Sequence, residues 1–514
     1  MIEDLLRDHS DQVLNALAAT TVSYLFFSFI IYPLYFHPLA NVPGPKICAL
    51  SKYYILYISW AERRNRFVQE LHLKYGPIVR IGPNEIDISD SNYLKDIYVN
   101  DYDKSSFYTQ FTNYGAFNTF STVEKKVHRE SRKASAKFYS KSNIMSEPVQ
   151  HKVKTVMTTL LGILNENQEK SINVFYLWSM MAMDGITSFS FGEKYYDPLL
   201  NDPFNRGADI IRKFLIQSSS WFWTTSMPSL YDIFVDNSVN KATDDVNGWI
   251  EKQFTNSLKS LDDPSQYTLV TTLLDKEKSM VKGKPNIFDE ARAKSEAFDH
   301  IAAGHNTTAT TLSYLYFELA SHPEMQSKLQ NELKAFNNGQ FRSTSDLSSF
   351  DYSEIEYLPY MNAIINETFR KYAAIPGQEP RIVPKGGLRL KSLNDVIVPQ
   401  GTIVTMQPWS LHRQPNIFEN PEKFDPERWL IEDESKLKLM NKNMMHFGSG
   451  ARMCVGMNLA TCEIKLNVAN ILSRYHVELV DGFDYEKKIQ MKDIYTTVPD
   501  ECNVPILFKA LKTL

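Results

Sequence analysis

The sequence is poor in cysteine and has no excess of positive charge. Its 514 residues include only four cysteines, Cys48, Cys454, Cys462 and Cys502, too few for a disulfide scaffold and consistent with a reducing, cytosol-facing location. Lysine and arginine number 56 against 60 acidic residues, a net charge of −4, which argues against a nucleic-acid binder. With 20 glycines and 24 prolines, collagen-like and low-complexity chains are excluded.

Several familiar patterns are also missing. The chain has no C-x-x-C pair, no H-E-x-x-H motif and no cluster of cysteine and histidine, so zinc and iron–sulfur sites are not expected. No repeat of solenoid length occurs, and no long Gly/Ser linker divides residues 51–514. We therefore expect one large domain over residues 51–514.

One long apolar segment lies near the N-terminus. Residues 13–36 carry no charge and are long enough to span a bilayer with some tilt. The preceding residues hold four acidic side chains and one arginine, unlike the basic start of a cleaved signal peptide. Basic residues follow the segment, so the positive-inside rule predicts that the bulk of the chain stays cytosolic. The sequence predicts a luminal N-terminus at residues 1–11, a retained anchor helix at 12–36 and a stiff, proline-rich hinge at 37–50.

Helical patterns dominate the remaining sequence. The longest predicted helix covers residues 288–321, where apolar side chains recur at helical spacing. Another predicted helix covers residues 357–371. Short strands are predicted at residues 78–81, 86–88, 402–406 and 477–479. The predicted fold is mostly α with minor β.

A single cysteine lies in a glycine-rich loop, residues 447–456, which read FGSGARMCVG. Gly450 and Gly456 allow the backbone to approach a flat ligand closely. A helix predicted to follow directly, together with Arg452, favours a thiolate at Cys454. Such a thiolate suits one axial bond to a haem iron. A buried structural cysteine in a turn is the alternative.

This loop resembles the haem-binding signature of the cytochrome P450 family, with the spacing Phe447-x-x-Gly450-x-Arg452-x-Cys454-x-Gly456. Residues 367–370 read ETFR and match the family's ExxR motif, and residues 424–429 read FDPERW and resemble its PERF segment, with tryptophan in place of phenylalanine. The resemblance covers nearly the whole chain. It implies a buried charge network that braces the haem loop, formed by Glu367, Arg370 and Arg428, and it places Phe447 near the sulfur. For an isolated ExxR, a solvated surface pair is the alternative.

Residues 303–308 read AGHNTT and resemble the family's A-G-x-[D/E]-T segment above the haem. Ala303 and Gly304 would leave a gap for a small ligand, and Thr307 matches the threonine that positions oxygen and helps to deliver protons. Asn306 departs from the usual acidic residue, and an amide cannot relay a proton as a carboxylate can. Either protons arrive through water, Thr307 and His305, or the reaction needs no oxygen protonation.

The resemblance also implies cationic partners for the two haem carboxylates. These are Arg132 and His128, which stands where many members have tryptophan, together with Arg381 and Arg452; each could instead be an ordinary surface charge. The segments expected to line the substrate pocket are residues 111–120, 218–226, 302–307, 374–378 and 495–498.

The implied protein is a membrane-anchored monooxygenase with haem b, whose metal ligand is Cys454. Electrons would come from NADPH indirectly, through NADPH–cytochrome P450 reductase or with cytochrome b5, at the cytosolic face of the endoplasmic reticulum. The segments HPLANVPGPK, PRIVPKGG and HRQP resemble fungal members, many of which serve secondary-metabolite pathways. The expected substrate is a small metabolite, for which a cyclic dipeptide is one candidate. The alternative is a redox-neutral isomerase or dehydratase that acts on a peroxide.

Overall fold

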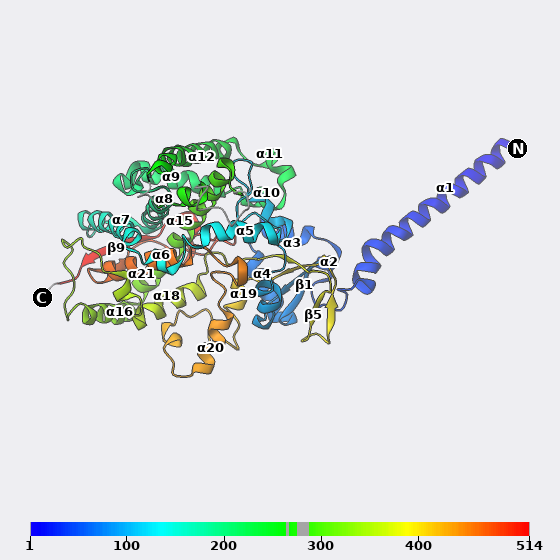
Figure 1. The fold of residues 1–514 in the computed structure, drawn as a ribbon. Helices are drawn as coiled ribbons and strands as arrows, with labels where there is room; N and C mark the ends of the chain where they lie inside the picture. The colour runs from blue at the N-terminus through cyan, green and yellow to red at the C-terminus, as the bar shows by residue number, and fades with distance from the viewer. Residues whose placement is uncertain (1, 264–266, 275–286, 513–514) are drawn as a thin grey trace.

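A long N-terminal helix projects from a helix-rich body (Figure 1). The computed structural model describes residues 2–263, 267–274 and 287–512. Helix α1 (Ile2–Phe26) continues into the wider turns of η1 (Phe27–Phe36), which contain Pro33, a residue with no N–H to donate. The segment Gln12–Phe36 contains an 18-residue stretch with a mean hydropathy of 1.7, none of which is buried. It is therefore long and apolar enough to cross a membrane.

Three small sheets accompany the helices. The largest has the strand order β1–β2–β7–β4, in which β2 and β7 pair in parallel and the other pairs are antiparallel. A second sheet has the order β3–β9–β8, and a third pairs β5 with β6. The strands are β1 (Ile78–Gly82), β2 (Glu85–Ile88), β3 (Ser171–Asn173), β4 (Arg381–Ile382), β5 (Leu388–Leu390), β6 (Val396–Val398), β7 (Ile403–Thr405), β8 (Tyr475–Leu479) and β9 (Pro505–Ala510).

The predicted hinge packs against this largest sheet. Leu39 and Val42 are buried in a small core that includes side chains of β1 and β2. The Arg80 guanidinium of β1 donates a hydrogen bond to the carbonyl oxygen of Pro33 at 2.8 Å. The predicted hinge, residues 37–50, ends in a short helix, α2 (Lys46–Leu50), whose Cys48 and Ala49 are also buried. Part of the hinge therefore packs against the body.

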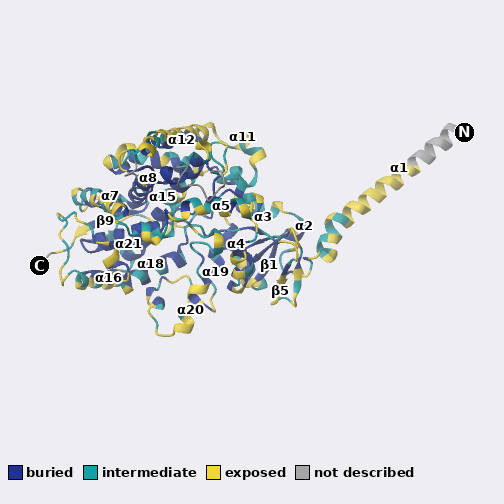
Figure 2. Cartoon of the chain, viewed as in Figure 1, coloured by how far each residue is buried: buried dark blue, intermediate teal, exposed yellow. Residues whose placement is uncertain are grey.

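Two helices form the centre of the body, α8 (Val174–Phe191) and α15 (Glu290–Ser321). Nearly every residue of α8 is buried, as expected of a helix with apolar and small side chains on all sides. Figure 2 shows α8 and α15 deep in the molecule, beneath more exposed helices such as α12 (Asn237–Ser257). Helix α21 (Met457–Leu472) packs against α15, so the loop before α21 reaches the middle of α15.

The other α-helices of the body that the structure describes lie around this centre or beside the sheets, with α4 against β1 and α20 at the edge of the body (Figure 1). They are α3 (Tyr53–Trp60), α4 (Arg64–Tyr75), α5 (Lys125–Ala136), α6 (Lys141–Ile144), α7 (Glu147–Glu166), α9 (Ala208–Ser218), α10 (Trp221–Ser226), α11 (Tyr231–Phe234), α13 (Leu269–Leu274), α16 (Pro323–Phe336), α17 (Tyr352–Ile355), α18 (Pro359–Lys371), α19 (Pro408–Leu411), α20 (Glu434–Asn443) and α22 (Tyr485–Lys488).

The prediction of a mostly α fold with minor β is confirmed. The two predicted helices correspond to α15 and α18, and the four predicted strands correspond to β1, β2, β7 and β8. Strands β3, β4, β5, β6 and β9 were not predicted. All but β9 have two or three residues, too few to show an alternating pattern in the sequence.

Candidate active site

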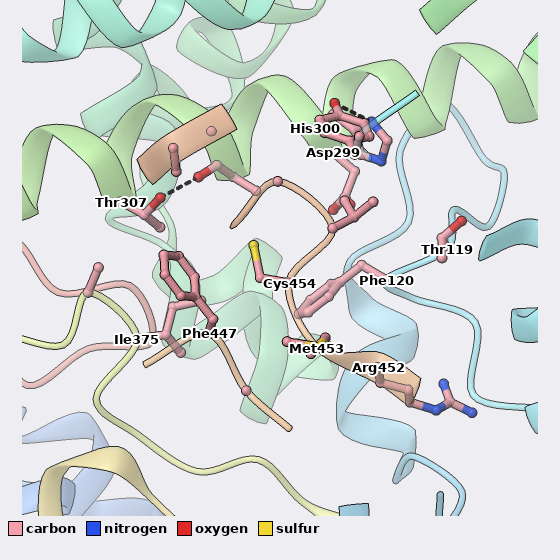
Figure 3. A pocket seen from close by; sticks show the side chains of 18 of the residues that line it. Thr119, Phe120, Asp299, His300, Thr307, Ile375, Phe447, Arg452, Met453 and Cys454 are labelled. Carbon is pink, nitrogen blue, oxygen red and sulfur yellow. Dashed lines mark hydrogen bonds between the residues drawn. The ribbon is translucent and has the colours of Figure 1, made fainter. Parts of the chain in front are cut away.

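A pocket lies between the middle of α15, the loop before α21 and helix α5. Cys454 directs its sulfur from the loop toward α15, and Thr307 projects from α15 on the facing wall (Figure 3). Among the described residues, no group of three or more His, Cys, Asp or Glu side chains is placed to hold a metal ion. A metal in this pocket would therefore not be held by a cluster of three such side chains from the described part of the chain.

The Cys454 loop is a tight turn held by backbone contacts. The Cys454 N–H donates to the Phe447 carbonyl oxygen at 2.8 Å. Gly450 has φ +72°, and a Cβ there would lie 2.1 Å from the carbonyl oxygen of Tyr98. Only glycine fits this position, because both the backbone angle and the contact exclude a side chain. The loop therefore presents Cys454 in one orientation, with Gly456 behind its sulfur.

The electrostatics of Cys454 differ from the sequence expectation. Burial raises the pKa of the Cys454 thiol, and it outweighs the backbone N–H groups of Gly456 and Met457 and the charge of Arg132, which lower it. The helix terminus and the nearby arginine therefore do not by themselves favour the thiolate. A bound metal cation is the influence that deprotonates a coordinating thiol outright.

The predicted charge network is present and fully buried. Glu367 and Arg370 are both inaccessible to solvent, and they form two hydrogen bonds of 2.7 and 2.9 Å. Arg428 reaches the same carboxylate at 3.2 Å. Trp429, which replaces the family's usual phenylalanine, donates its indole N–H to Glu367 at 3.0 Å. The alternative of a solvated surface pair is therefore wrong.

His412 links this network to the Cys454 loop. Arg370 donates to the His412 carbonyl oxygen at 3.2 Å, and the His412 ring lies 3.1 Å from the Arg370 carbonyl oxygen. The other ring nitrogen accepts the Met445 N–H at 2.8 Å, just before the loop begins. The Phe447 ring contacts the ring of Phe369, which lies within the ExxR segment. The network thus braces the cysteine loop through both hydrogen bonds and packing.

The α15 residues divide into two groups. Ala303, Gly304 and Thr307 line the pocket, and the Thr307 hydroxyl donates to the Ala303 carbonyl oxygen at 2.9 Å. A Cβ on Gly304 would come within 3.1 Å of the Ile186 side chain, so this glycine also permits close packing of α15 against α8. Asn306 is not among the lining residues, and its side-chain oxygen has no hydrogen-bond partner among the described residues.

His305 faces away from the pocket. Its ring contacts Phe214 and lies 3.0 Å from the Ile301 carbonyl oxygen. Burial lowers its pKa to about 4. The side chain is therefore neutral near pH 7 and belongs to the helix packing, and it does not lie on a path along the pocket wall.

Cationic and polar groups gather at one end of the pocket. Arg132 lines it, with no ion pair or hydrogen bond to any described residue. His128 is buried, and its Nδ1 has no partner in the described structure. Lys104, which sequence reasoning missed, donates to the Phe120 carbonyl oxygen at 2.6 Å, and burial lowers its pKa well below the ordinary value. Two carboxylates placed here would satisfy these groups, as the propionates of a haem require.

Arg381 and Arg452 line the same end of the pocket but already have partners. Arg452 lies 3.1 Å from Asp101 and donates to the carbonyl oxygens of Thr122 and Val123, each at 2.8 Å. Arg381 donates to the Tyr108 hydroxyl at 3.0 Å. Arg452 therefore fastens the cysteine loop to the chain before α5, a contact that the sequence did not indicate.

The rest of the lining partly matches the predicted segments. Thr119, Phe120, Ala374, Ile375 and Tyr495 line the pocket, whereas no residue of 218–226 does. Trp223 of that segment instead stacks on Phe234. The prediction missed further lining residues, which include Lys104, Tyr139, Asp299, His300 and Glu379. The spacing of apolar residues in the sequence could not identify these lining residues, because a polar side chain has the same place in that spacing whether it faces a pocket or a neighbouring loop.

Comparison with known proteins agrees with this geometry. The profile of the family described as Cytochrome P450 matches residues 43–501. The chain is 32% identical to "Cytochrome P450 monooxygenase orf2" of Aspergillus niger over 472 residues, covering 89% of this chain and 90% of that protein. It is 30% identical to "Cytochrome P450 monooxygenase sdnE" of Sordaria araneosa, covering 91% and 92%, and 26% identical to "Cytochrome P450 monooxygenase ucsK" of Acremonium sp, covering 90% and 92%.

Proposed function

The chain belongs to the cytochrome P450 family and is a haem-thiolate monooxygenase, and on that premise we propose the residues that carry its activity. Cys454 would hold the haem iron through its sulfur. The supporting observation is its position, because its sulfur points across the pocket toward α15, where Thr307 lines the facing wall (Figure 3).

The haem carboxylates bind at the cationic end of the pocket. Arg132, His128 and Lys104 have free donor capacity there, and Arg381 and Arg452 add positive charge. When bound, haem supplies the activation of dioxygen. The chain's own part is to hold the iron through Cys454, to keep that loop rigid through Glu367 and Arg370, and to place the Thr307 hydroxyl where a proton is needed.

Protons reach this site through water and Thr307. Asn306 lies outside the pocket lining, so its amide does not touch a molecule bound at the centre of the pocket. The Thr307 hydroxyl can accept from water while it donates to the Ala303 carbonyl oxygen. A monooxygenase that takes up protons in each turnover therefore needs no carboxylate at residue 306.

Electrons come from NADPH through NADPH–cytochrome P450 reductase, with cytochrome b5 as a second donor. Helix α5 supports this part of the proposal: Lys126, Arg129 and Lys133 are exposed along it at helical spacing. They lie on the same helix as Arg132, which lines the pocket, so a partner with an acidic face could dock close to the haem. The apolar helix up to Phe36 anchors the enzyme in the endoplasmic reticulum membrane, with residues 1–11 luminal and the body cytosolic.

The substrate is a small organic metabolite of a fungal biosynthetic pathway, with a cyclic dipeptide as one candidate. The related monooxygenases from Aspergillus niger and other fungi support the biosynthetic setting. The pocket wall supports the size and polarity, since it combines Phe120 and Tyr495 with polar side chains.

Two measurements test this function. The ferrous carbon monoxide complex of the purified protein should show a thiolate-type absorption band, and Cys454→Ala should abolish it; a band that survives in Cys454→Ala would refute the ligand assignment. Accurate-mass comparison of cells with and without the gene should reveal a lost product that is heavier than its precursor by oxygen or lighter by two hydrogens. A lost product isomeric with its precursor, or differing only by water, would move the enzyme to the redox-neutral class.

A further inference from the structure

A chain of three buried polar side chains connects α15 with the end of α5. The hydroxyl of Tyr139, three residues after α5, lies 3.0 Å from Nδ1 of His300 on α15. Nε2 of His300 lies 3.2 Å from the carboxylate of Glu296, one turn earlier on the same helix. Tyr139 and His300 line the pocket, and Figure 3 shows His300 on the helix that carries Thr307. The proposed haem site uses none of these three side chains.

The Glu296 carboxylate determines which nitrogen of His300 carries the proton. The Thr119 N–H donates to Glu296 at 2.7 Å. Burial alone would raise the pKa of Glu296, but its contacts with His300 and Thr119 lower the pKa below the ordinary value, so the group is ionised near neutral pH. An ionised carboxylate holds the imidazole proton on Nε2, which leaves Nδ1 as an acceptor. The Tyr139 hydroxyl is therefore the donor in its hydrogen bond with His300.

Tyr139 differs in this respect from the other tyrosines that line the pocket in the described structure, Tyr108 and Tyr495. The Tyr108 hydroxyl accepts from the guanidinium of Arg381 at 3.0 Å, and a guanidinium cannot take up a proton. Within the described part of the chain, no histidine or carboxylate forms a hydrogen bond with the Tyr495 hydroxyl. Of these three phenols, Tyr139 is thus the one whose hydroxyl meets a neutral base.

The Tyr139 ring is held beside the cysteine loop and away from solvent. Asn458, on the first turn of α21 and four residues after Cys454, donates to the Tyr139 carbonyl oxygen at 2.9 Å. The residue is 3% exposed, and its ring packs edge-to-face against Phe138 and Phe189, with ring centroids 5.5 and 5.2 Å apart. A haem held in this pocket by Cys454 would therefore share the pocket with the Tyr139 ring.

These features suit a phenol that loses an electron and a proton together. Burial raises the pKa of the Tyr139 hydroxyl well above the ordinary value, so the phenolate is not present near neutral pH. Removal of an electron from a phenol makes its O–H group strongly acidic. A neutral imidazole in hydrogen-bond contact can accept that proton at once, and the Glu296 carboxylate then stabilises the imidazolium.

We propose that Tyr139 is a redox-active tyrosine, which returns an electron to the haem when a peroxide or peroxyacid has oxidised it and no substrate is bound. The O–H bond of Tyr139 breaks, and an N–H bond forms at Nδ1 of His300. Tyr139 loses one electron and becomes a neutral phenoxyl radical, and the haem gains that electron. The oxidant removes two electrons in all and ends as water and an alcohol or acid, with protons from solvent. The external electron donor supplies the second electron and later reduces the radical, while His300 returns the proton. This inference rests on the proposed function and adds a protective reaction at the same site.

The test is electron paramagnetic resonance of the substrate-free, full-length haem protein in detergent, frozen within milliseconds of mixing with peracetic acid. We expect a radical signal that narrows when the protein is grown on ring-deuterated tyrosine, which identifies a tyrosyl radical. Tyr139→Phe should lose this signal, whereas the matched control Tyr108→Phe should keep it. His300→Gln retains the phenol but removes the base, so its tyrosyl signal per haem should fall. A tyrosyl signal that is unchanged in Tyr139→Phe, or equally strong in His300→Gln, would overturn the proposal.

Loss of haem absorbance tests the protective role separately. Without Tyr139 the oxidising equivalent stays on the haem, so peracetic acid should bleach Tyr139→Phe faster than Tyr108→Phe. Equal bleaching rates in these two variants would refute protection by Tyr139.

The carbon monoxide spectrum of each preparation separates this inference from the proposed function. Variants are compared where they keep the thiolate-type band, and His300→Gln supplies the comparison if Tyr139→Phe does not fold. A thiolate-type band in a wild-type protein that forms no tyrosyl radical would refute the redox role of Tyr139 alone. Absence of that band in the wild-type protein would overturn the function on which the inference rests.

Discussion

Glu367 is the single side chain on which the buried charge network depends. It accepts from Arg370 at 2.7 and 2.9 Å, from Arg428 at 3.2 Å, from the Asp425 N–H at 2.9 Å and from the Trp429 indole at 3.0 Å. Glu367→Gln preserves the shape of the side chain but removes the negative charge. It also replaces one acceptor oxygen with an N–H₂ group that faces donors.

The expected loss of stability is large because two arginines remain without their counter-charge. Arg370 is fully buried, and the side chain of Arg428 is 9% exposed. Breaking a buried ion pair by removing one partner costs about 3–5 kcal/mol. The remaining bonds of Arg370 to the His412, Pro421 and Lys423 carbonyl oxygens keep it in place without neutralising it.

Trp429→Phe is the matched control. It removes one neutral donor from the same carboxylate and leaves both ion pairs intact, so it should cost about 1–3 kcal/mol. The assay follows the loss of the haem absorption band as urea is added. The difference in midpoint between variant and wild type, multiplied by the slope of the transition, gives the change in the free energy of unfolding. Because His412 connects the network to Met445, just before the cysteine loop, we expect Glu367→Gln to lose the haem band at a much lower urea concentration than Trp429→Phe.

Two results would refute this reasoning. If the free energy of unfolding of Glu367→Gln lies within about 1 kcal/mol of the wild-type value, the charge of the network does not stabilise the haem-bound state. If Trp429→Phe costs as much as Glu367→Gln, the effect comes from packing around residue 429 and not from the ion pairs.

Two further predictions concern the pocket. Arg132→Gln and Lys104→Met each remove a cation from the end of the pocket that is assigned to the haem carboxylates. Each variant should therefore transfer its haem to apomyoglobin faster than the wild type does. Unchanged transfer rates in both variants would contradict that assignment. Gly304→Ala would place a methyl group 3.1 Å from Ile186, so its thermal midpoint should fall despite a helix-propensity gain of about 1 kcal/mol. In an Ile186→Ala background, which is itself destabilised, adding Gly304→Ala should cause no further fall. A midpoint of Gly304→Ala at or above wild type would show that Ile186 and α8 adjust to the methyl group.

Motifs with fixed spacing were the part of the site that could be predicted. The spacing of the motif residues from Phe447 to Gly456 identified Cys454, because that spacing is typical of one particular loop. The ExxR motif identified Glu367 and Arg370, because residues i and i+3 share a helix face. The long helix was predictable from its apolar period, and within it Thr307 does line the pocket.

Other parts depended on contacts between distant segments. Arg452, expected to serve a haem carboxylate, lines the pocket and also pairs with Asp101, 351 residues earlier in the chain, a contact that no motif indicates. Lys104 and Glu379 reach the pocket from segments with no motif. The helix terminus was expected to favour a thiolate at Cys454, but burial raises the pKa of that thiol more than local dipoles lower it.

The sequence by itself determined the family, the helical fold and the cysteine loop, because each is encoded by residues that are close together along the chain. Only the tertiary structure decided which side chains face the pocket and which of them keep free donors or acceptors. Asp299 and Asn306 lie seven residues apart on the same helix, yet only Asp299 lines the pocket. Burial and pairing are properties of segments brought together by folding, so they could not be predicted from spacing alone.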